Sequence, residues 1–260
     1  MKSDFDEAAL TYDHDFTYSS IGKAQRNQVW KYLDKYLNNK DKLRILELNC
    51  GTGEDAKRFA DRGYLVTATD VSDMMLKQAQ SKSVGKEIYF QKLDFNEIES
   101  FDQDEKFDLV FSNFGGLNCI DPEVLKRVNT KISTLVNQGG SFIAVVMPDF
   151  CFWESIYFML KRKWGEVFRR SGKYAMANVS NEQVKTFYFS PSKFQKLSPL
   201  CFKRELLKPI GLFIPPSYLE EFFKKRPGLL KMFQNFDRLT AHFSWQAYLS
   251  DHYYIQFSIK

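Results

Sequence analysis

Residues 43–55, LRILELNCGTGED, decide the fold of this chain. The first six are mostly apolar, which is typical of a buried strand, and the glycines favour a tight turn into a helix. A glycine lets the backbone approach a ligand without a Cβ in the way, and the first turn of a helix offers free N–H groups. The stretch therefore predicts a strand, a ligand-binding turn and a helix in succession.

Strands and helices alternate along the chain on both sides of this stretch. We expect helices over residues 19–38, up to Gly63, over 73–81 and over 121–138, and strands over 64–69, 88–93, 107–112 and 141–147. Alternation at this pace implies parallel strands joined by right-handed crossovers. We therefore predict an α/β domain with a doubly wound, mostly parallel, seven-stranded sheet.

The pattern is less regular beyond residue 148. A helical stripe of aromatic and aliphatic residues over 153–168 precedes an expected hairpin around 174–189 and a short helix from residue 190. A strand over 202–212, a helix over 229–239 and a last strand over 252–259 follow. We interpret residues 149–189 and 213–250 as helical insertions on one sheet, because neither is expected to fold alone.

Composition excludes several classes of protein. The formal net charge of +5 on 260 residues is too small and too spread out to indicate nucleic acid by itself. No apolar run reaches the roughly 20 residues of a membrane span, and the acidic N-terminus is unlike a signal peptide. The four cysteines stand far apart, so neither a zinc site nor a disulfide framework is indicated. We expect a cytosolic protein with no metal site.

Polar side chains stand at the ends of the first four expected strands, those over residues 43–48, 64–69, 88–93 and 107–112. In a doubly wound sheet these ends meet at the ligand-binding edge. Glu47 can bind an ammonium group there, and Asp70 can accept two ribose hydroxyls. Asp94 can take an adenine amino group while Phe95 stacks on the ring. The glycine turn alone also fits a nicotinamide-binding fingerprint, so a nicotinamide-dependent oxidoreductase stays open as an alternative.

These motifs resemble class I S-adenosylmethionine-dependent methyltransferases. The sequence E-L-N-C-G-T-G, Asp70 after the second strand and L-D-F after the third look like motifs I to III of that class. A lead of the F-D-x-x-A-x-x-Y-D type, common in the ubiquinone/menaquinone branch, is matched by Phe5, Asp6, Ala9, Tyr12 and Asp13. Asn49 departs from the pattern at the first glycine position, and asparagine adopts the left-handed conformation better than most residues.

The resemblance implies a cofactor, S-adenosylmethionine, and a set of residues that hold it. Glu47, Asn49, Cys50 and Gly51 would line the methionine end, Asp70 would hold the ribose, and Asp94 with Phe95 would hold the adenine. Asn113 would lie beside the sulfonium, and Tyr12 would close over the cofactor. Gly53, Val71, Met75 and Phe114 complete the expected contacts. Residues 1–40 would then be an N-terminal lid and helix, 41–148 the cofactor-binding core, and 252–260 the last strand of a single domain over 1–260.

No catalytic group stands out in the sequence. Methyl transfer depends chiefly on alignment, and a base is needed only for a protonated acceptor. Of the three histidines, His14 and His242 are weak candidates for such a base, and we interpret His252, at the start of the last strand, as structural.

We predict methylation of a small, apolar or aromatic metabolite at oxygen or carbon. The insertions and the N-terminal segment, rich in aromatic residues, would form an apolar lid over the acceptor. An RNA methyltransferase is a further alternative, but the chain lacks a basic, aromatic-interleaved module and an N-P-P-Y motif. The basic residues of 161–163 and 169–170 are typical of a solvated helix face and also fit an acidic substrate or an anionic membrane surface. No oligomeric state is indicated.

Overall fold

The computed structural model describes residues 5–179 and 182–259. The helices are α1 (Ser20–Leu37), α2 (Glu54–Ala60), α3 (Asp73–Lys82), α4 (Pro122–Leu135), α5 (Phe152–Leu160), α6 (Pro191–Lys196), α7 (Glu220–Lys224) and α8 (Pro227–Thr240). The strands are β1 (Arg44–Leu48), β2 (Leu65–Asp70), β3 (Ile88–Lys92), β4 (Phe107–Ser112), β5 (Val136–Val146), β6 (Ala175–Val179), β7 (Glu182–Thr186), β8 (Phe202–Ile210) and β9 (His252–Ile259).

The central sheet has seven strands in the order β3-β2-β1-β4-β5-β9-β8. Strands β1 to β5 pair in parallel, whereas β9 runs antiparallel to both β5 and β8. The order reverses between β1 and β4, which is the switch point of a doubly wound sheet. The predicted fold class is therefore confirmed. Because β9 is antiparallel, its first residue lies at the edge where the parallel strands end.

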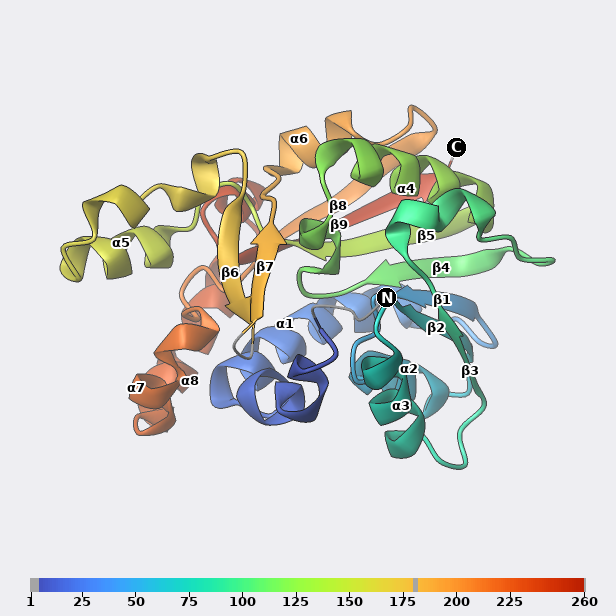
Figure 1. The fold of residues 1–260 in the computed structure, drawn as a ribbon, viewed down its shortest axis with the longest axis horizontal. Coiled ribbons are helices and arrows are strands. Elements are labelled where there is room, and N and C mark those ends of the chain that lie inside the picture. The colour runs from blue at the N-terminus through green and yellow to red at the C-terminus, as the bar shows by residue number, and fades with distance from the viewer. Residues whose placement is uncertain (1–4, 180–181, 260) are drawn as a thin grey trace.

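Alternating side chains of the strands build a separate core on each face of the sheet. On β1, Leu46 and Leu48 join a cluster with α4 and α6, whereas Ile45 joins a cluster with α1, α2 and α3. Figure 1 shows α4 and α6 on one side of the sheet and α1, α2 and α3 on the other. A strand covered on both faces reads as a continuous apolar run, which is why residues 43–48 carry so strong a signal.

Local signals set the helix starts as the sequence predicts. The hydroxyl of Ser72 accepts from the backbone N–H of Met75 at 3.1 Å and caps α3. Asp121 accepts from the backbone N–H groups of Glu123 and Val124 and caps α4, with Pro122 in its first turn. These caps need only neighbours in the chain, so the sequence contains the whole signal.

Two expected helix ends are wrong. Helix α4 ends at Leu135 instead of residue 138, because Val136 already pairs with Phe107 of β4 and the double glycine falls inside β5 instead of before it. Helix α5 ends at Leu160 although its apolar stripe continues to residue 168. Arg162 has a φ of 55°, which no α-helix tolerates, and the chain turns back there.

The insertions lie together beyond the carboxyl edge of the sheet. Figure 1 shows α5, the β6–β7 hairpin, α7 and α8 on the side toward which the β4 arrow points. The ring of Trp153 on α5 contacts Phe223 of α7 and Phe233 of α8, with centroid separations of 6.4 and 5.8 Å. The two insertions therefore pack against each other as well as against the sheet.

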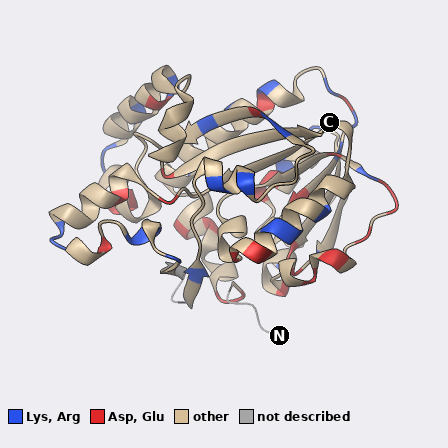
Figure 2. Ribbon diagram, turned by 90° about the horizontal axis from the view of Figure 1, so that it is seen from above, with Lys and Arg blue, Asp and Glu red and all other residues tan. Residues whose placement is uncertain are grey.

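The expected basic face of residues 161–170 is only partly basic in the fold. Arg170 is buried and bonds to Glu154 and Asp251, and Arg169 also pairs with Glu154. Only residues 161–163 remain as exposed cations there. Figure 2 shows basic and acidic residues interspersed along the ribbon in that view. Within residues 5–179 and 182–259, every helix is too short or too polar to cross a bilayer.

Asp237 of α8 fastens the loop that follows β8. Its carboxylate is 1% exposed and accepts hydrogen bonds from the backbone N–H groups of three consecutive residues, Leu212, Phe213 and Ile214, at 2.9 to 3.1 Å. Backbone N–H groups that lose their partner while buried each cost about 1–3 kcal/mol. This one carboxylate therefore determines how the second insertion leaves the sheet.

We predict that Asp237→Ala lowers the free energy of unfolding by at least about 1–3 kcal/mol, because buried N–H donors lose their acceptor. The measurement is urea denaturation followed by circular dichroism. The control is Asp61→Ala, which removes an exposed acid paired with Lys86 and should change stability by no more than about 0.5 kcal/mol. Equal effects of the two substitutions would contradict the prediction.

Candidate active site

The strand ends that the sequence singles out meet at one edge of the sheet. Strand β1 lies between β2 and β4, so the turn after Leu48, the residues after Asp70 and those after Ser112 are neighbours. Asn113 and Phe114 directly follow β4. This edge is where ligands bind in doubly wound sheets.

Asn49 holds the turn after β1 against the end of β4. It has a φ of 47°, as expected for a residue in place of glycine. Its amide donates to the backbone carbonyl of Asn113 at 2.9 Å and accepts from the Ser112 hydroxyl at 2.6 Å. A Cβ added to Gly116 would lie 2.2 Å from Asn49 Cγ. The side chain of Asn49 therefore fills the space that the missing side chain of Gly116 leaves free.

The two glycines of the turn face different surroundings. A Cβ added to Gly51 would meet only the edge of the Tyr12 ring, at 4.0 Å, so the space over this residue is open on the ligand side. A Cβ added to Gly53 would lie 2.7 Å from the Cβ of Ala79 on α3. Gly53, predicted to contact the cofactor, is thus required for helix packing, whereas Gly51 borders free space.

Asp70 binds the turn through its carboxylate. One oxygen accepts from the backbone N–H of Gly51 at 2.8 Å and the other from that of Ser72 at 3.0 Å. Burial raises the pKa of Asp70, and these N–H groups oppose the rise. Because a carboxylate oxygen accepts more than one hydrogen bond, Asp70 can hold the turn and still receive ligand hydroxyls.

Glu47 is a buried carboxylate with an unsatisfied oxygen. The residue is 2% exposed, and Oε2 has no hydrogen-bond partner among the described residues. Burial, with the nearby charge of Asp55, raises the pKa of Glu47 well above its ordinary value. The adjacent Cys50 is buried, and its thiol contacts the Gly51 carbonyl at 3.6 Å. A buried oxygen without a partner costs free energy unless a ligand supplies a donor.

A charge cluster that the sequence interpretation missed lies beside these residues. Asp55 accepts from the Trp30 indole at 2.6 Å, from the Asn113 amide at 2.7 Å and from the Arg26 guanidinium. Burial favours the neutral acid, but the charge and hydrogen bonds of Arg26 hold the pKa of Asp55 below its ordinary value. The guanidinium of Arg26 also lies 5.2 Å from the centre of the Phe114 ring. The available signal was one arginine on the apolar face of α1, four positions before Trp30.

Residues 45–140 match the family model described as a methyltransferase domain. The protein YqeM of Bacillus subtilis is 36% identical over 143 residues, which are 51% of this chain and 56% of its own. A demethylmenaquinone methyltransferase of Clavibacter sepedonicus is 32% identical over 141 residues, covering 54% of each chain. A malonyl-[acyl-carrier protein] O-methyltransferase of Acetivibrio thermocellus is 32% identical over 134 residues, 50% of this chain and 44% of its own. The chain spans about half the length of the curated relatives it matches.

Residues 45–140 are similar to a class I S-adenosylmethionine-dependent methyltransferase domain, the class that the sequence motifs resemble. This similarity supports the predicted enzyme class and cofactor, and the nicotinamide and RNA alternatives are not favoured. The solved structure of PH0226 from Pyrococcus horikoshii has the same fold, with a TM-score of 0.60 at 18% identity over 96% of this chain and 98% of that one.

The N-terminal segment lies over the turn of the methyltransferase domain and is fastened to it by polar contacts. Asp13 accepts from the Thr52 hydroxyl and from Lys82, both at 2.6 Å. The ring of Tyr12 packs in a cluster with Met75, and burial raises the pKa of Tyr12 to about 12. Asp6 accepts from the Ser72 hydroxyl at 2.5 Å. The segment thus covers Gly51 as a lid would, and its role in cofactor binding stays a prediction.

The residues expected at the adenine lie farther along the edge. Asp94 caps the short 3-10 helix η3 (Phe95–Ser100) by accepting from the backbone and side-chain N–H groups of Asn96, each at 2.8 Å. Phe95 packs on the core cluster under α4. Val71, directly after Asp70, is half-buried. The role of these three residues in cofactor binding remains a prediction.

The two histidines considered as bases lie on the surface. The imidazole of His14 is 88% exposed and lies 2.8 Å from an Asp15 oxygen. His242 is exposed at the end of α8, where Nδ1 lies 3.0 Å from the carbonyl oxygen of Leu239. Neither has a described contact with the strand ends. His252, interpreted as structural, is buried against Phe114, with ring centres 5.3 Å apart.

We predict that Asp70→Ala loses most of the affinity for S-adenosylhomocysteine. Two charge-assisted hydrogen bonds to the ribose would be lost, each worth about 1.5–3 kcal/mol. Isothermal titration calorimetry measures the effect, and Asp70→Asn, which keeps the side-chain shape, should lose less. Unchanged affinity in Asp70→Ala would mean that the ribose binds elsewhere.

We also predict that Gly51→Val abolishes binding of S-adenosylhomocysteine, because a branched side chain would fill the free space over the turn. Gly51 has a φ of 54°, so part of any effect is backbone strain. The matched control is Gly63→Val, since Gly63 has a φ of 80° and nothing within 4 Å of an added Cβ. Equal affinity of the two variants in the same calorimetric titration would exclude a contact between Gly51 and the cofactor.

Proposed function

We propose that this protein transfers the methyl group of S-adenosylmethionine to an oxygen or carbon of a small acceptor that is largely apolar or aromatic. The unpaired Oε2 of buried Glu47, beside the open face of Gly51, is the observation that carries the cofactor part of the proposal. An ammonium group is the donor this oxygen lacks, and the methionine end of the cofactor carries one. The residues present therefore fit the group.

Each part of the cofactor has candidate partners in this chain. Glu47 would bind the ammonium, Asp70 the ribose hydroxyls, and Asp94 with Phe95 the adenine. Tyr12 would cover the bound molecule from the N-terminal segment. When bound, S-adenosylmethionine supplies a methyl group made electrophilic by a sulfonium, and the chain's own residues hold, orient and desolvate the two reactants.

The acceptor side of the proposal rests on the apolar residues around Phe114 and in the insertions. Tyr157 of α5 contacts Tyr218 before α7, with ring centres 4.8 Å apart, and the Trp153 indole donates to the Phe213 carbonyl at 2.9 Å. Sugar-like acceptors need buried polar partners for their hydroxyls. Rings dominate these contacts, which favours an apolar lid over an aromatic or lipid-like acceptor.

Partners and location also belong to the proposal. Figure 2 shows basic and acidic residues interspersed, Arg170 is buried, and the exposed basic runs at residues 161–163 and 224–226 are short. Nucleic acid is therefore not the acceptor we propose. The cytosolic location expected from the sequence stays a prediction.

Two measurements in sequence test this function. Calorimetry should show binding of S-adenosylhomocysteine and none of NADH by the full chain. Release of S-adenosylhomocysteine should then be measured with a panel that pairs aromatic or isoprenoid acceptors with sugars and nucleosides. Turnover confined to the polar half of the panel would contradict an apolar acceptor, and NADH binding alone would overturn the enzyme class.

A further inference from the structure

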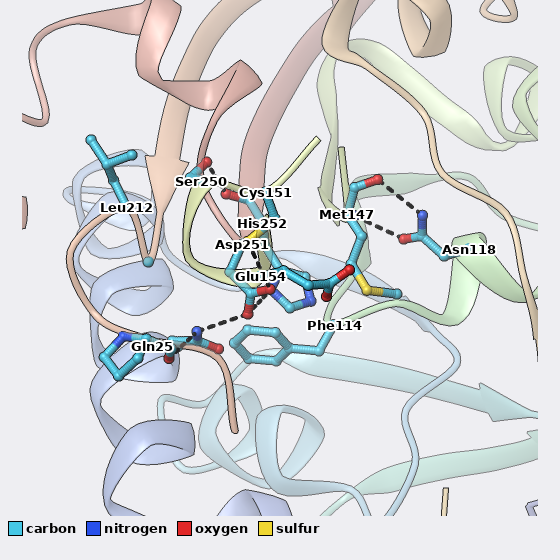
Figure 3. Close-up of polar contacts among 12 residues, drawn as sticks. Gln25, Phe114, Asn118, Met147, Cys151, Glu154, Leu212, Ser250, Asp251 and His252 are labelled. Carbon is cyan, nitrogen blue, oxygen red and sulfur yellow. Dashed lines mark hydrogen bonds and ion pairs between the residues drawn. The ribbon is translucent and has the colours of Figure 1, made fainter. Parts of the chain in front are cut away.

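His252 lies at the edge of the sheet where the acceptor is expected, because β9 runs antiparallel and begins there. Its imidazole stands perpendicular to the Phe114 ring, at an interplanar angle of 89°. Met147 comes from the end of the neighbouring strand β5, and its Cε lies 3.2 Å from the Cβ position of Gly115. Figure 3 shows the Phe114 ring next to His252, with Met147 close by. The imidazole therefore borders the segment that follows β4.

Asp251 holds one side of this imidazole. Its Oδ2 lies 3.2 Å from Nδ1 of His252 and accepts from the Gln25 amide at 3.0 Å, while Oδ1 accepts from Arg170 at 2.8 Å. Burial favours the neutral acid, but His252 and Arg170 hold the pKa of Asp251 far below its ordinary value. An ionised carboxylate beside Nδ1 favours a proton on that nitrogen and leaves Nε2 as the proton acceptor.

The carboxylate is itself fixed by a buried network. Arg170 also donates to the backbone carbonyl of Asp251 at 2.9 Å and to Glu154 at 3.0 Å. The thiol of Cys151 lies 3.9 Å from Asp251. The guanidinium of Arg26 also contacts the Phe114 ring, with Cζ 5.2 Å from its centre. Burying such a network of charges costs free energy unless every member is paired. Because Asp251, its central carboxylate, directly precedes His252, the network calls for an explanation.

A purely structural histidine does not explain the arrangement. Buried imidazoles normally use their nitrogens for hydrogen bonds. Nδ1 of His252 lies within ion-pair distance of Asp251 but outside hydrogen-bond alignment, and no described residue hydrogen-bonds to Nε2. The side chain keeps 9% of its surface exposed. Catalytic hydrogen bonds are often misaligned until the substrate binds, so this geometry fits a base at rest.

We propose that His252, positioned by Asp251, is a catalytic residue that removes the proton from the acceptor, and that the acceptor class is a phenol, enol or hydroquinone instead of a carboxylic acid. The inference rests on the proposed function and deepens it. A carboxylic acid is already ionised at neutral pH and needs no base, whereas a phenol with a pKa of about 10 does. The hydroxyl proton moves to Nε2 of His252 as the acceptor oxygen bonds to the methyl carbon, and the methyl–sulfur bond breaks with its electron pair left on sulfur. The imidazolium then returns the proton to water.

The decisive experiment varies the acidity of the acceptor. Naphthol and a nitro-substituted naphthol that is ionised at neutral pH are compared as probes in wild-type protein and in His252→Gln. We expect kcat/KM to fall about 100-fold or more with naphthol, the usual contribution of a general base, and by less than about 5-fold with the ionised probe. Equal loss with both probes would mean a structural role and would overturn the proposal, as would methylation of an aryl carboxylic acid while both naphthols are inert.

Three further measurements keep the test decisive. Binding of S-adenosylhomocysteine should be the same in wild-type protein and His252→Gln, and failure of wild-type protein to bind it would count against the proposed function instead. His242→Gln and His14→Gln test the competing histidines, and a selective loss with naphthol in either would overturn the assignment. The chain has three histidines, so imidazole NMR signals resolve each one. Naphthol added with S-adenosylhomocysteine should shift the His252 signal alone, and Asp251→Asn should change its tautomer, whereas no response of His252 would refute the proposal.

Discussion

The buried carboxylate of Asp55 connects three elements that the rest of the site depends on. Arg26 and Trp30 reach it from α1, it belongs to α2 itself, and Asn113 reaches it from the end of β4. Removing one partner of a buried charge cluster costs several kcal/mol, because the remaining charges are left without compensation. These hydrogen bonds therefore fix how α1 lies against the sheet. They also fix the direction of the Asn113 side chain, which follows β4.

The same cluster gives the edge of the sheet an excess of negative charge. Glu47, Asp55 and Asp70 are all buried there, and the cation of Arg26 acts on Glu47 and Asp55. Burial raises the pKa of Glu47 and Asp70, which is the cost of holding acids together without full compensation. A ligand with an ammonium and a sulfonium would relieve that cost, so the electrostatics of the site favour a cation of this kind.

The second buried network, around Asp251, differs in being balanced. Arg169 and Arg170 offset the charges of Glu154 and Asp251, and Asp251 is held ionised beside His252. Arg170 belongs to the first insertion and Asp251 directly precedes the last strand, so the network ties the insertion to the acceptor side of the sheet. The insertion therefore does more than cover the site, since it contributes the arginine that keeps a carboxylate charged there.

The sequence by itself determined the class of fold and most of the strand ends, because these depend on local patterns, and it indicated the cofactor through the resemblance of its motifs to a known family. Apolar runs, the glycine turn, the Ser72 cap and the acids after each strand act on neighbours in the chain, and their spacing is visible without a structure.

Only the tertiary structure decided which polar groups meet. Arg26 and Asp55 are 29 residues apart and Arg170 and Asp251 are 81 apart, and no periodicity encodes such contacts. Nor did the sequence show that Gly53 faces Ala79, or that His252 lies against Phe114 while His14 and His242 lie in solvent. Those outcomes follow from how the sheet and its insertions pack, which brings distant residues together by burying apolar surface.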